Sequence, residues 1–146
     1  MTIFVPITLW GFIPFVLMLY AVLPPRRAMI TAILAGWLFL PMSGYTFSGL
    51  PEYTKVSAIS FGILLGAAMF DSRRLLDFRP SWFDLPILVW CLCPIVSSII
   101  NQIVGNNLLM SLYGGLTITF DHLVMWGIPY LIGRIYFRTF DHLREL

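Results

Sequence analysis

The sequence predicts an all-α membrane protein, a polytopic bundle of about five transmembrane helices that form a single domain over residues 1–146. The chain is 59% hydrophobic and only 11% charged, with a mean hydropathy of +0.87. A soluble domain carries about 25% charged residues, so this chain has too few polar residues to coat a water-facing surface. Long apolar runs recur along the sequence, and basic residues follow every second run. These observations together predict repeated crossing of a bilayer.

The basic residues also predict the orientation of the bundle. Short loops rich in arginine and lysine stay in the cytoplasm during insertion. Lys55 is the single basic residue expected on the opposite side. The N terminus is therefore expected outside and the C terminus in the cytoplasm, and no basic stripe remains that would indicate nucleic-acid binding. The arginines that define the cytoplasmic side are Arg26, Arg27, Arg73, Arg74, Arg79, Arg134, Arg138 and Arg144.

The first two spans are expected at residues 3–23 and 28–45. The first has the ~20 residues needed to cross a hydrocarbon core of ~30 Å, and a helix in lipid tolerates an internal proline such as Pro14. The Pro24-Pro25 pair ends this helix at the cytoplasmic face. The second span is short, so tilt or local thinning of the bilayer must absorb the mismatch.

The third span is expected at residues 56–70, after a turn-rich outer loop. Ala58, Gly62 and Gly66 follow one another at four-residue spacing, which places them on one helix face. Small residues there let a second helix approach closely. This stripe predicts packing against another helix of the same chain, or alternatively homodimerisation.

The fourth span is expected at residues 85–100, after a cytoplasmic interfacial loop in which Asp84 caps the helix start. Cys91 and Cys93 lie within this span. Side chains two residues apart point to nearly opposite faces of a helix, so this pair is expected to pack in the membrane and not to bind a metal. The sequence predicts no metal site and no cofactor.

A half-buried helix on the outer face is expected at residues 108–120, followed by the fifth span at 121–137. An ionised aspartate at the bilayer centre costs about 2.5–3.5 kcal/mol, so Asp121 and His122 are expected at the outer interface. Asp121 would then cap the fifth span. The alternative is that this pair acts as an acid and base or contacts a polar substrate.

Two further positions are candidates for substrate or lipid contact. Arg134 lies near the cytoplasmic end of the fifth span, where it either anchors the helix at the headgroups or binds an anionic lipid-linked substrate. Glu52, beside Tyr53 and Lys55 in the outer loop, either contacts a sugar or belongs to an ordinary interfacial turn. The chain has no phosphate-binding loop, zinc-protease motif or nucleophile elbow, so no catalytic residue is predicted.

Several sequence strings resemble the N-terminal portion of bacterial polytopic proteins of the O-antigen ligase and polymerase superfamily. The strings are Leu-Pro-Pro-Arg-Arg-Ala (23–28), Gly-Trp-Leu-Phe-Leu-Pro (36–41), Gly-Leu-Pro-Glu-Tyr-Thr-Lys (49–55), Phe-Arg-Pro-Ser-Trp-Phe-Asp-Leu-Pro (78–86) with the following Trp-Cys-Leu-Cys-Pro, and Gly-Ile-Pro-Tyr-Leu-Ile-Gly-Arg-Ile-Tyr-Phe (127–137). They extend over most of the chain after Leu23, and they are interfacial strings without a catalytic motif.

The resemblance implies a multi-pass protein of the bacterial inner membrane. Proteins of that family are GT-C type glycosyltransferases of about a dozen helices, which transfer or polymerise glycans carried on undecaprenyl diphosphate at the periplasmic face. Their catalytic loop belongs to the C-terminal half, so this chain is expected to be inactive alone. Its expected partners are membrane lipid, the lipid-linked glycan, and a missing C-terminal membrane domain or partner subunit. The alternatives are a non-enzymatic scaffold or assembly protein, and a fragment of a transporter.

Overall fold

The computed structural model describes residues 4–45, 51–102 and 108–137, and the regular structure of these residues is helical. An isolated antiparallel bridge between Tyr45 and Tyr53 adds one extended pairing. The elements are α1 (Phe4–Val22), α2 (Pro25–Phe39), α3 (Lys55–Phe70), α4 (Ser72–Leu76), the 3₁₀ helix η1 (Trp82–Asp84), α5 (Leu85–Gln102), α6 (Leu108–His122), the π-helix η2 (Leu123–Gly127) and α7 (Ile128–Tyr136).

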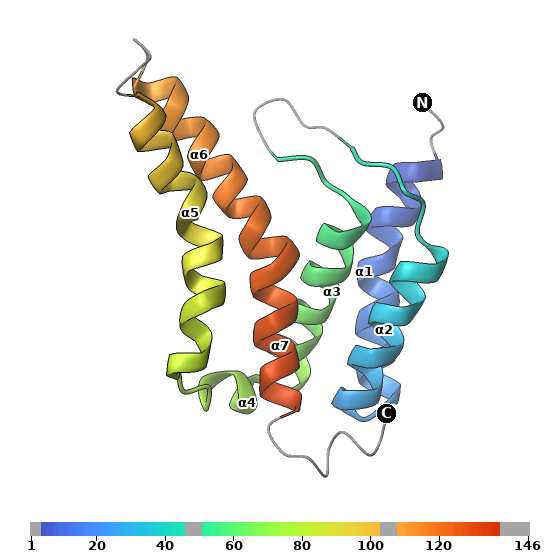
Figure 1. Cartoon of the computed structure of the whole chain (residues 1–146). Coiled ribbons are helices and arrows are strands. Elements are labelled where there is room, and N and C mark those ends of the chain that lie inside the picture. Colours follow the sequence, from blue (N-terminus) through green and yellow to red (C-terminus); the bar gives the residue numbers. More distant parts are fainter. Residues whose placement is uncertain (1–3, 46–50, 103–107, 138–146) are drawn as a thin grey trace.

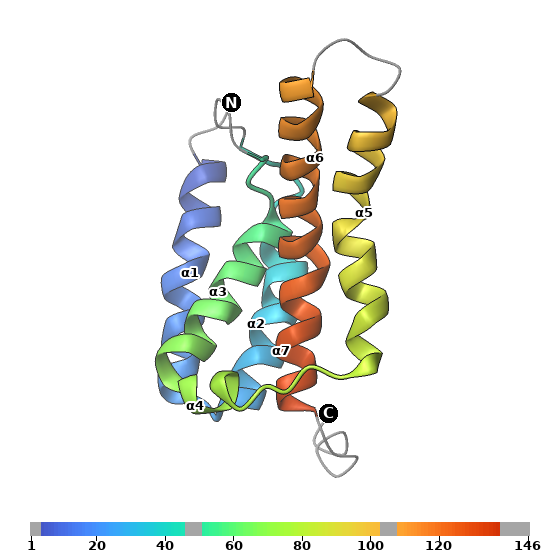
Figure 2. The ribbon, with the colours of Figure 1, turned by 90° about the vertical axis from the view of Figure 1, so that its left-hand side faces the viewer.

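The long helices lie roughly along one common axis, and α1, α2, α3, α5 and α6 alternate in direction along the chain, with α7 continuing α6 (Figures 1 and 2). The lower end of the bundle in Figure 1 contains the end of α1, the start of α2, the short helices α4 and η1, and the end of α7. We call this end the arginine end, because the described arginines belong to these segments. Lys55 begins α3 at the opposite end. The arginines are Arg26 and Arg27 in α2, Arg73 and Arg74 in α4, Arg79 before η1, and Arg134 in the last turn of α7.

Two of the described helices are long and apolar enough to cross a membrane, namely α1 and the run Trp82–Asn101, each with a mean hydropathy of 2.0. Only 22% of the residues in the first and 11% in the second are buried inside the molecule. A core helix of a soluble protein would be mostly buried, whereas these two present apolar surface outward. The shorter apolar helix α3 has 16 residues. Five separate spans are therefore not confirmed, although the expected helical fold is.

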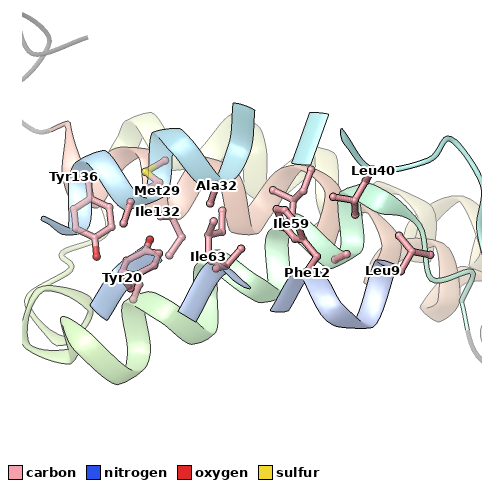
Figure 3. Packing of buried hydrophobic residues seen from close by; sticks show 14 residues of the cluster. Leu9, Phe12, Tyr20, Met29, Ala32, Leu40, Ile59, Ile63, Ile132 and Tyr136 are labelled. Carbon is pink, nitrogen blue, oxygen red and sulfur yellow. The ribbon is translucent and has the colours of Figure 1, made fainter. Parts of the chain in front are cut away.

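The core of the bundle lies around α3, which contacts α1, α2, α7 and η2. Residues of α1 that recur every three or four positions face inward, as expected for one side of a helix. Figure 3 shows these side chains beside those of α2, α3 and α7. Small residues on α2 and α3 allow the close approach. The hydrophobic core cluster includes Leu9, Phe12, Val16 and Tyr20 of α1, Ala28, Met29 and Ala32 of α2, Ala58, Ile59, Ile63 and Ala67 of α3, and Ile132 and Tyr136 of α7.

The helix α5 packs along α6 and joins the rest of the bundle through η2. The two helices approach closely at Gly115, where an added Cβ would lie 2.8 Å from Ser98 Cβ and 3.3 Å from the Pro94 carbonyl oxygen. No real side chain tolerates the shorter distance without movement, so glycine at this position sets the spacing of the pair.

The predicted break between a helix at 108–120 and a separate span at 121–137 is absent from the structure. Leu108 to Tyr136 form one continuous helical column, in which α6, η2 and α7 follow without a break (Figures 1 and 2). Pro129 explains the π-helix. Proline has no N–H and its ring clashes with the carbonyl four residues earlier, and a wider turn relieves that clash. Accordingly, the Ile128 N–H bonds to the Leu123 carbonyl, five residues back.

Other boundaries differ from the prediction by a few residues. The second helix begins at Pro25 and ends at Phe39, and proline is favoured in the first turn because no partner for its N–H is needed there. Helix α3 begins at Lys55, where the Thr54 hydroxyl accepts a hydrogen bond from the Ser57 N–H at 3.4 Å. Residues 46–50 of the predicted outer loop at 43–55, residues 103–107 of the one at 101–107, and Arg138 and Arg144 lie outside the described residues.

Candidate functional site

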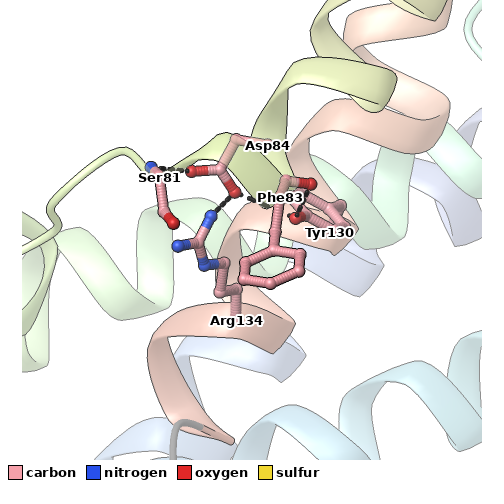
Figure 4. A network of polar contacts seen from close by, with 5 residues as sticks. All are labelled: Ser81, Phe83, Asp84, Tyr130 and Arg134. Atoms are coloured by element: carbon pink, nitrogen blue, oxygen red, sulfur yellow. Dashed lines mark hydrogen bonds and ion pairs between the residues drawn. The ribbon is translucent and has the colours of Figure 1, made fainter.

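The most connected polar group of the described residues lies at the arginine end, and Figure 4 shows it from close by. We call it the Asp84 network. One oxygen of the Asp84 carboxylate, Oδ2, accepts a hydrogen bond from the Ser81 N–H at 2.7 Å. The other, Oδ1, accepts one from the Tyr130 hydroxyl at 2.9 Å and forms an ion pair with Arg134. The Tyr130 hydroxyl also lies 3.1 Å from the Phe83 carbonyl oxygen.

The Asp84 network ties the start of α5 to α7. Asp84 is 7% exposed, and a carboxylate so deeply buried requires a cation and hydrogen bonds to remain charged. Arg134 supplies the charge, and its guanidinium also lies 5.5 Å from the centre of the Phe78 ring. The expected capping role of Asp84 is present in altered form, because its carboxylate bonds to the Ser81 N–H ahead of η1.

An apolar groove with a volume of about 440 Å³ opens beside this network. We call it the α5–α7 groove. Its walls come from α5, η2 and α7, with Leu64 of α3 among the residues that line it. Phe78, Pro80 and Asp84 lie at the arginine end of the groove, and Gly127 of the π-helix lines its side. Cavities of this size are large enough to hold part of a small molecule or a lipid chain.

A thiol joins α5 to the irregular turn of the long column. Cys91 is buried, and its Sγ donates to the His122 carbonyl oxygen at 3.6 Å. Cys93 is exposed. Within the described ranges, no group of three or more histidine, cysteine, aspartate or glutamate side chains could hold a metal ion.

At the end opposite the arginines, the candidate cation Lys55 is buried and engaged. Its exposed fraction is 8%, and its ammonium lies 4.6 Å from the centre of the Trp37 ring. A cation over an aromatic face is stabilised most when it is removed from water. Lys55 therefore begins α3 and joins that helix to α2, whereas the sequence placed it in the outer loop.

Aromatic rings connect this end of the bundle across several elements. The Tyr53 ring stacks on Trp10 of α1 with ring centres 5.3 Å apart, and on Phe61 of α3 at 6.4 Å. Phe61 in turn lies 6.5 Å from Phe120 of α6. Burial raises the pKa of the Tyr53 phenol above its ordinary value. This ladder of rings fixes the position of the segment before α3.

The structure places Asp121 and His122 inside the long helical column, where Asp121 does not cap a helix. The His122 ring donates from Nδ1 to the Ile118 carbonyl oxygen at 2.8 Å, one turn earlier. The ring also lies edge-on to Trp90 of α5, with centres 5.8 Å apart. The exposed Glu52 comes within electrostatic range of Asp121. Glu52 and Asp121 are both acidic, so neither is a cationic partner for the other. The Nδ1 hydrogen of His122 is bonded to a carbonyl of its own helix.

The small-residue stripe of α3 lies against α1. Ala58, Gly62 and Gly66 are buried. A Cβ added at Gly62 would lie 3.1 Å from Val16 Cγ2, and one at Gly66 would lie 2.5 Å from the Tyr20 ring. The stripe therefore supports a contact within this chain.

Sequence reasoning missed the partners of Arg134, which it placed among the headgroups. The available signal was the pairing rule for charges in or near a membrane, which almost always have a partner of opposite sign. Asp84 and Arg134 lie fifty positions apart, so nothing local in the sequence linked them. Tyr130 and Trp37 were missed for the same reason. No family model, curated protein or solved structure matches this chain.

Proposed function

We propose that this chain forms the N-terminal membrane bundle of a surface-polysaccharide ligase or polymerase, which acts on lipid-linked glycans at the periplasmic face of the bacterial inner membrane. The proposal begins from the resemblance of five interfacial strings to that superfamily. It assigns the chain a structural role in the enzyme, and it places the transfer chemistry outside these residues.

The observation that carries the proposal is that four of these five strings meet in two pairs in the folded chain. The string at 78–86 contains Asp84, and its ion pair and hydrogen bond lead to Arg134 and Tyr130 of the string at 127–137. At the opposite end, Trp37 of the string at 36–41 contacts Lys55 of the string at 49–55. Strings that are far apart in sequence and that contact one another act as one structural unit, which supports reading them together.

The same contacts support a structural role for the ionisable candidates. Arg134 is bound to Asp84, Lys55 lies over Trp37, and His122 bonds to its own helix. A transfer of a glycan from a lipid diphosphate needs cationic groups that are free to contact the leaving group. The apolar outer side of α5, where Leu92, Val96 and Ile100 are each more than 40% exposed, offers a surface for further membrane helices.

Deleting the gene in the organism that carries it tests the proposal. Surface polysaccharide would be analysed on gels and the undecaprenyl-linked glycans by mass spectrometry. We expect loss of long or ligated glycan and accumulation of the lipid-linked precursor. Complementation with the wild-type gene should restore the pattern. Complementation with Asp84→Asn tests the Asp84 network, and Asp77→Asn, which changes an exposed acid outside that network, is its matched control. Normal polysaccharide and no accumulated precursor in the deletion strain would contradict the proposal.

The exposed side of α5 also favours a second candidate, a non-enzymatic assembly protein that binds another membrane protein. Only 11% of the residues in the run Trp82–Asn101 are buried in this chain. A photo-crosslinking amino acid at Val96, which is 54% exposed and outside the lining of the α5–α7 groove, would capture the partner in cells. Capture of a membrane protein, combined with unchanged polysaccharide in the deletion strain, would favour this candidate over the enzyme bundle.

A further inference from the structure

The α5–α7 groove has the chemistry of a site for a hydrocarbon chain. Its volume is about 440 Å³ and its lining is almost entirely apolar, with Leu88, Leu123 and Leu131 among the side chains. It lies along α5, the helix with the least buried surface of the two candidate spans. An apolar groove beside a membrane-crossing helix is in contact with acyl chains, which fill it without any loss of hydrogen bonds.

The polar groups at the end of the groove are already satisfied by one another. Asp84 is the acidic residue in the lining, and Ser81, Tyr130 and Arg134 occupy its two oxygens. Its negative charge is therefore compensated and does not repel an anion nearby. Arg134 is equally occupied, because it contacts both Asp84 and the face of Phe78. The arginine that the sequence suggested for lipid contact is thus held by Asp84, which lines the groove.

Arg79 is the exposed cation next in sequence to the residues that line the arginine end of the groove. It stands between Phe78 and Pro80, both of which line the groove. Its side chain is exposed, and among the described residues it makes no hydrogen bond or ion pair. A guanidinium placed at headgroup depth pairs with a phosphate in two-point geometry.

The charge balance of the arginine end favours an anionic partner. Six arginines lie at this end of the described chain, against three aspartates, Asp71, Asp77 and Asp84. Asp71 pairs with Arg74 at 3.3 Å and Asp84 pairs with Arg134, so the remaining positive charge belongs to the other arginines. An anionic membrane surface attracts such a group with ~1 kcal/mol per arginine.

We propose that the α5–α7 groove binds one anionic phospholipid of the membrane, with an acyl chain between α5 and α7 and the headgroup phosphate at Arg79. The inference goes beyond the proposed function, because it holds whether the chain serves a polysaccharide enzyme or an assembly protein. The lipid would fill the space between α5 and α7 and hold the α5–α6 pair in place against the rest of the bundle.

Native mass spectrometry of the purified full chain tests the proposal. The protein would be released from micelles that contain palmitoyl-oleoyl phosphatidylglycerol or, in parallel, the phosphatidylcholine with the same chains. We expect one retained phosphatidylglycerol and about fivefold weaker retention of phosphatidylcholine, which corresponds to ~1 kcal/mol for one arginine. Equal retention of the two lipids would refute the headgroup assignment.

Variants of the groove test the position of the acyl chain. A Cβ added at Gly127 would lie 3.4 Å from Leu123 and 3.8 Å from Cys91 Sγ, both of which line the groove, so Gly127→Leu places a side chain inside it. Its matched control is Gly114→Leu, because no atom of the described residues outside the local helix backbone lies within 4 Å of a Cβ there. We expect Gly127→Leu to lose the retained lipid and Gly114→Leu to keep it.

A second pair of variants decides the question if Gly127→Leu fails to fold. Leu88 lines the groove and is 55% exposed, so Leu88→Phe enlarges a wall residue that has room to move. The adjacent Val89 is 58% exposed and does not belong to the lining, which makes Val89→Phe the control. Retention of phosphatidylglycerol by folded Leu88→Phe at the level of Val89→Phe would refute the groove as the site.

Arg79→Gln tests the headgroup contact against Arg27→Gln, an exposed arginine at the same end on α2. We expect the first to reduce phosphatidylglycerol to the level of phosphatidylcholine and the second to retain the preference. An unchanged preference in Arg79→Gln overturns the assignment. If instead the groove variants abolish a dimer in the mass spectrum and leave lipid retention unchanged, the groove binds a second copy of this chain and the proposal is wrong.

Discussion

Replacing the glycines of α3 with alanine tests the contact between α1 and α3 quantitatively. At Gly66, the added Cβ would lie 2.5 Å from Cδ2 of the Tyr20 ring, a distance at which something must shift. Tyr20 is only 3% exposed, so its ring has little free space to enter. Overpacking of this kind destabilises a core by ~1–3 kcal/mol. At Gly62 the nearest atom is Val16 Cγ2 at 3.1 Å, and a movement of a few tenths of an ångström relieves the contact.

Gly114 supplies the reference for this experiment, because in the described part of the chain nothing beyond the local helix backbone lies within 4 Å of a Cβ there. Alanine is favoured over glycine within a helix by ~1 kcal/mol, and that gain applies to every one of these helical positions. The difference between Gly66→Ala and Gly114→Ala therefore isolates the contact with Tyr20. We expect Gly66→Ala to be less stable than Gly114→Ala by ~1–3 kcal/mol, and Gly62→Ala to fall between them.

Thermal unfolding in a mild detergent, followed by circular dichroism, measures this order. The folded yield of Gly62→Leu gives a second reading, since a leucine there cannot fit against Val16 and should reduce the yield. If Gly66→Ala unfolds at the same temperature as Gly114→Ala, or higher, then α1 does not lie on the glycine face of α3. The stripe would in that case face lipid or a second copy.

Three further predictions concern the polar network, the topology and the activity. Asp84→Asn should lower the free energy of unfolding by ~1–3 kcal/mol, less than the ~3–5 kcal/mol expected for a fully buried ion pair, because Arg134 is partly exposed. Unfolding temperatures of Asp84→Asn and Asp77→Asn check this, and equal temperatures would show that the Asp84 network does not stabilise the fold. A fluorescent protein fused after Leu146 should be bright and an alkaline phosphatase fusion inactive; active phosphatase would place the C terminus outside and contradict the predicted topology. The purified chain should transfer no glycan from an undecaprenyl-linked donor; transfer that His122→Ala abolishes would place a catalytic group in α6.

The continuity of the α6–α7 column shows where local reasoning failed. The predicted break at Asp121 rested on the energy of a lone carboxylate in hydrocarbon, which is a property of one residue. In the structure, Asp121 and His122 continue the helix, and the irregular turn occurs a few residues later at Leu123–Gly127. Pro129 was visible in the sequence, but a proline specifies only that a helix must deform and not that it will deform into a π-helix.

The sequence alone determined the properties that depend on neighbouring residues. Low charge and long apolar runs predicted a helical chain, Pro24 and Pro25 predicted the turn between α1 and α2, and the order of the arginines predicted their grouping at one end. Each of these follows from local composition or from the helical period, so no knowledge of the packing was needed.

The tertiary structure decided which residues meet across helices. The ion pair of Asp84 with Arg134, the contact of Lys55 with Trp37 and the glycine contact with Tyr20 depend on the rotation and the axial offset of each helix. Those two quantities come from how side chains of different helices interlock over the whole bundle, and the helical period of a single segment does not contain them. For that reason Arg134 read as a headgroup anchor in the sequence, whereas in the folded chain it is the partner of a buried carboxylate.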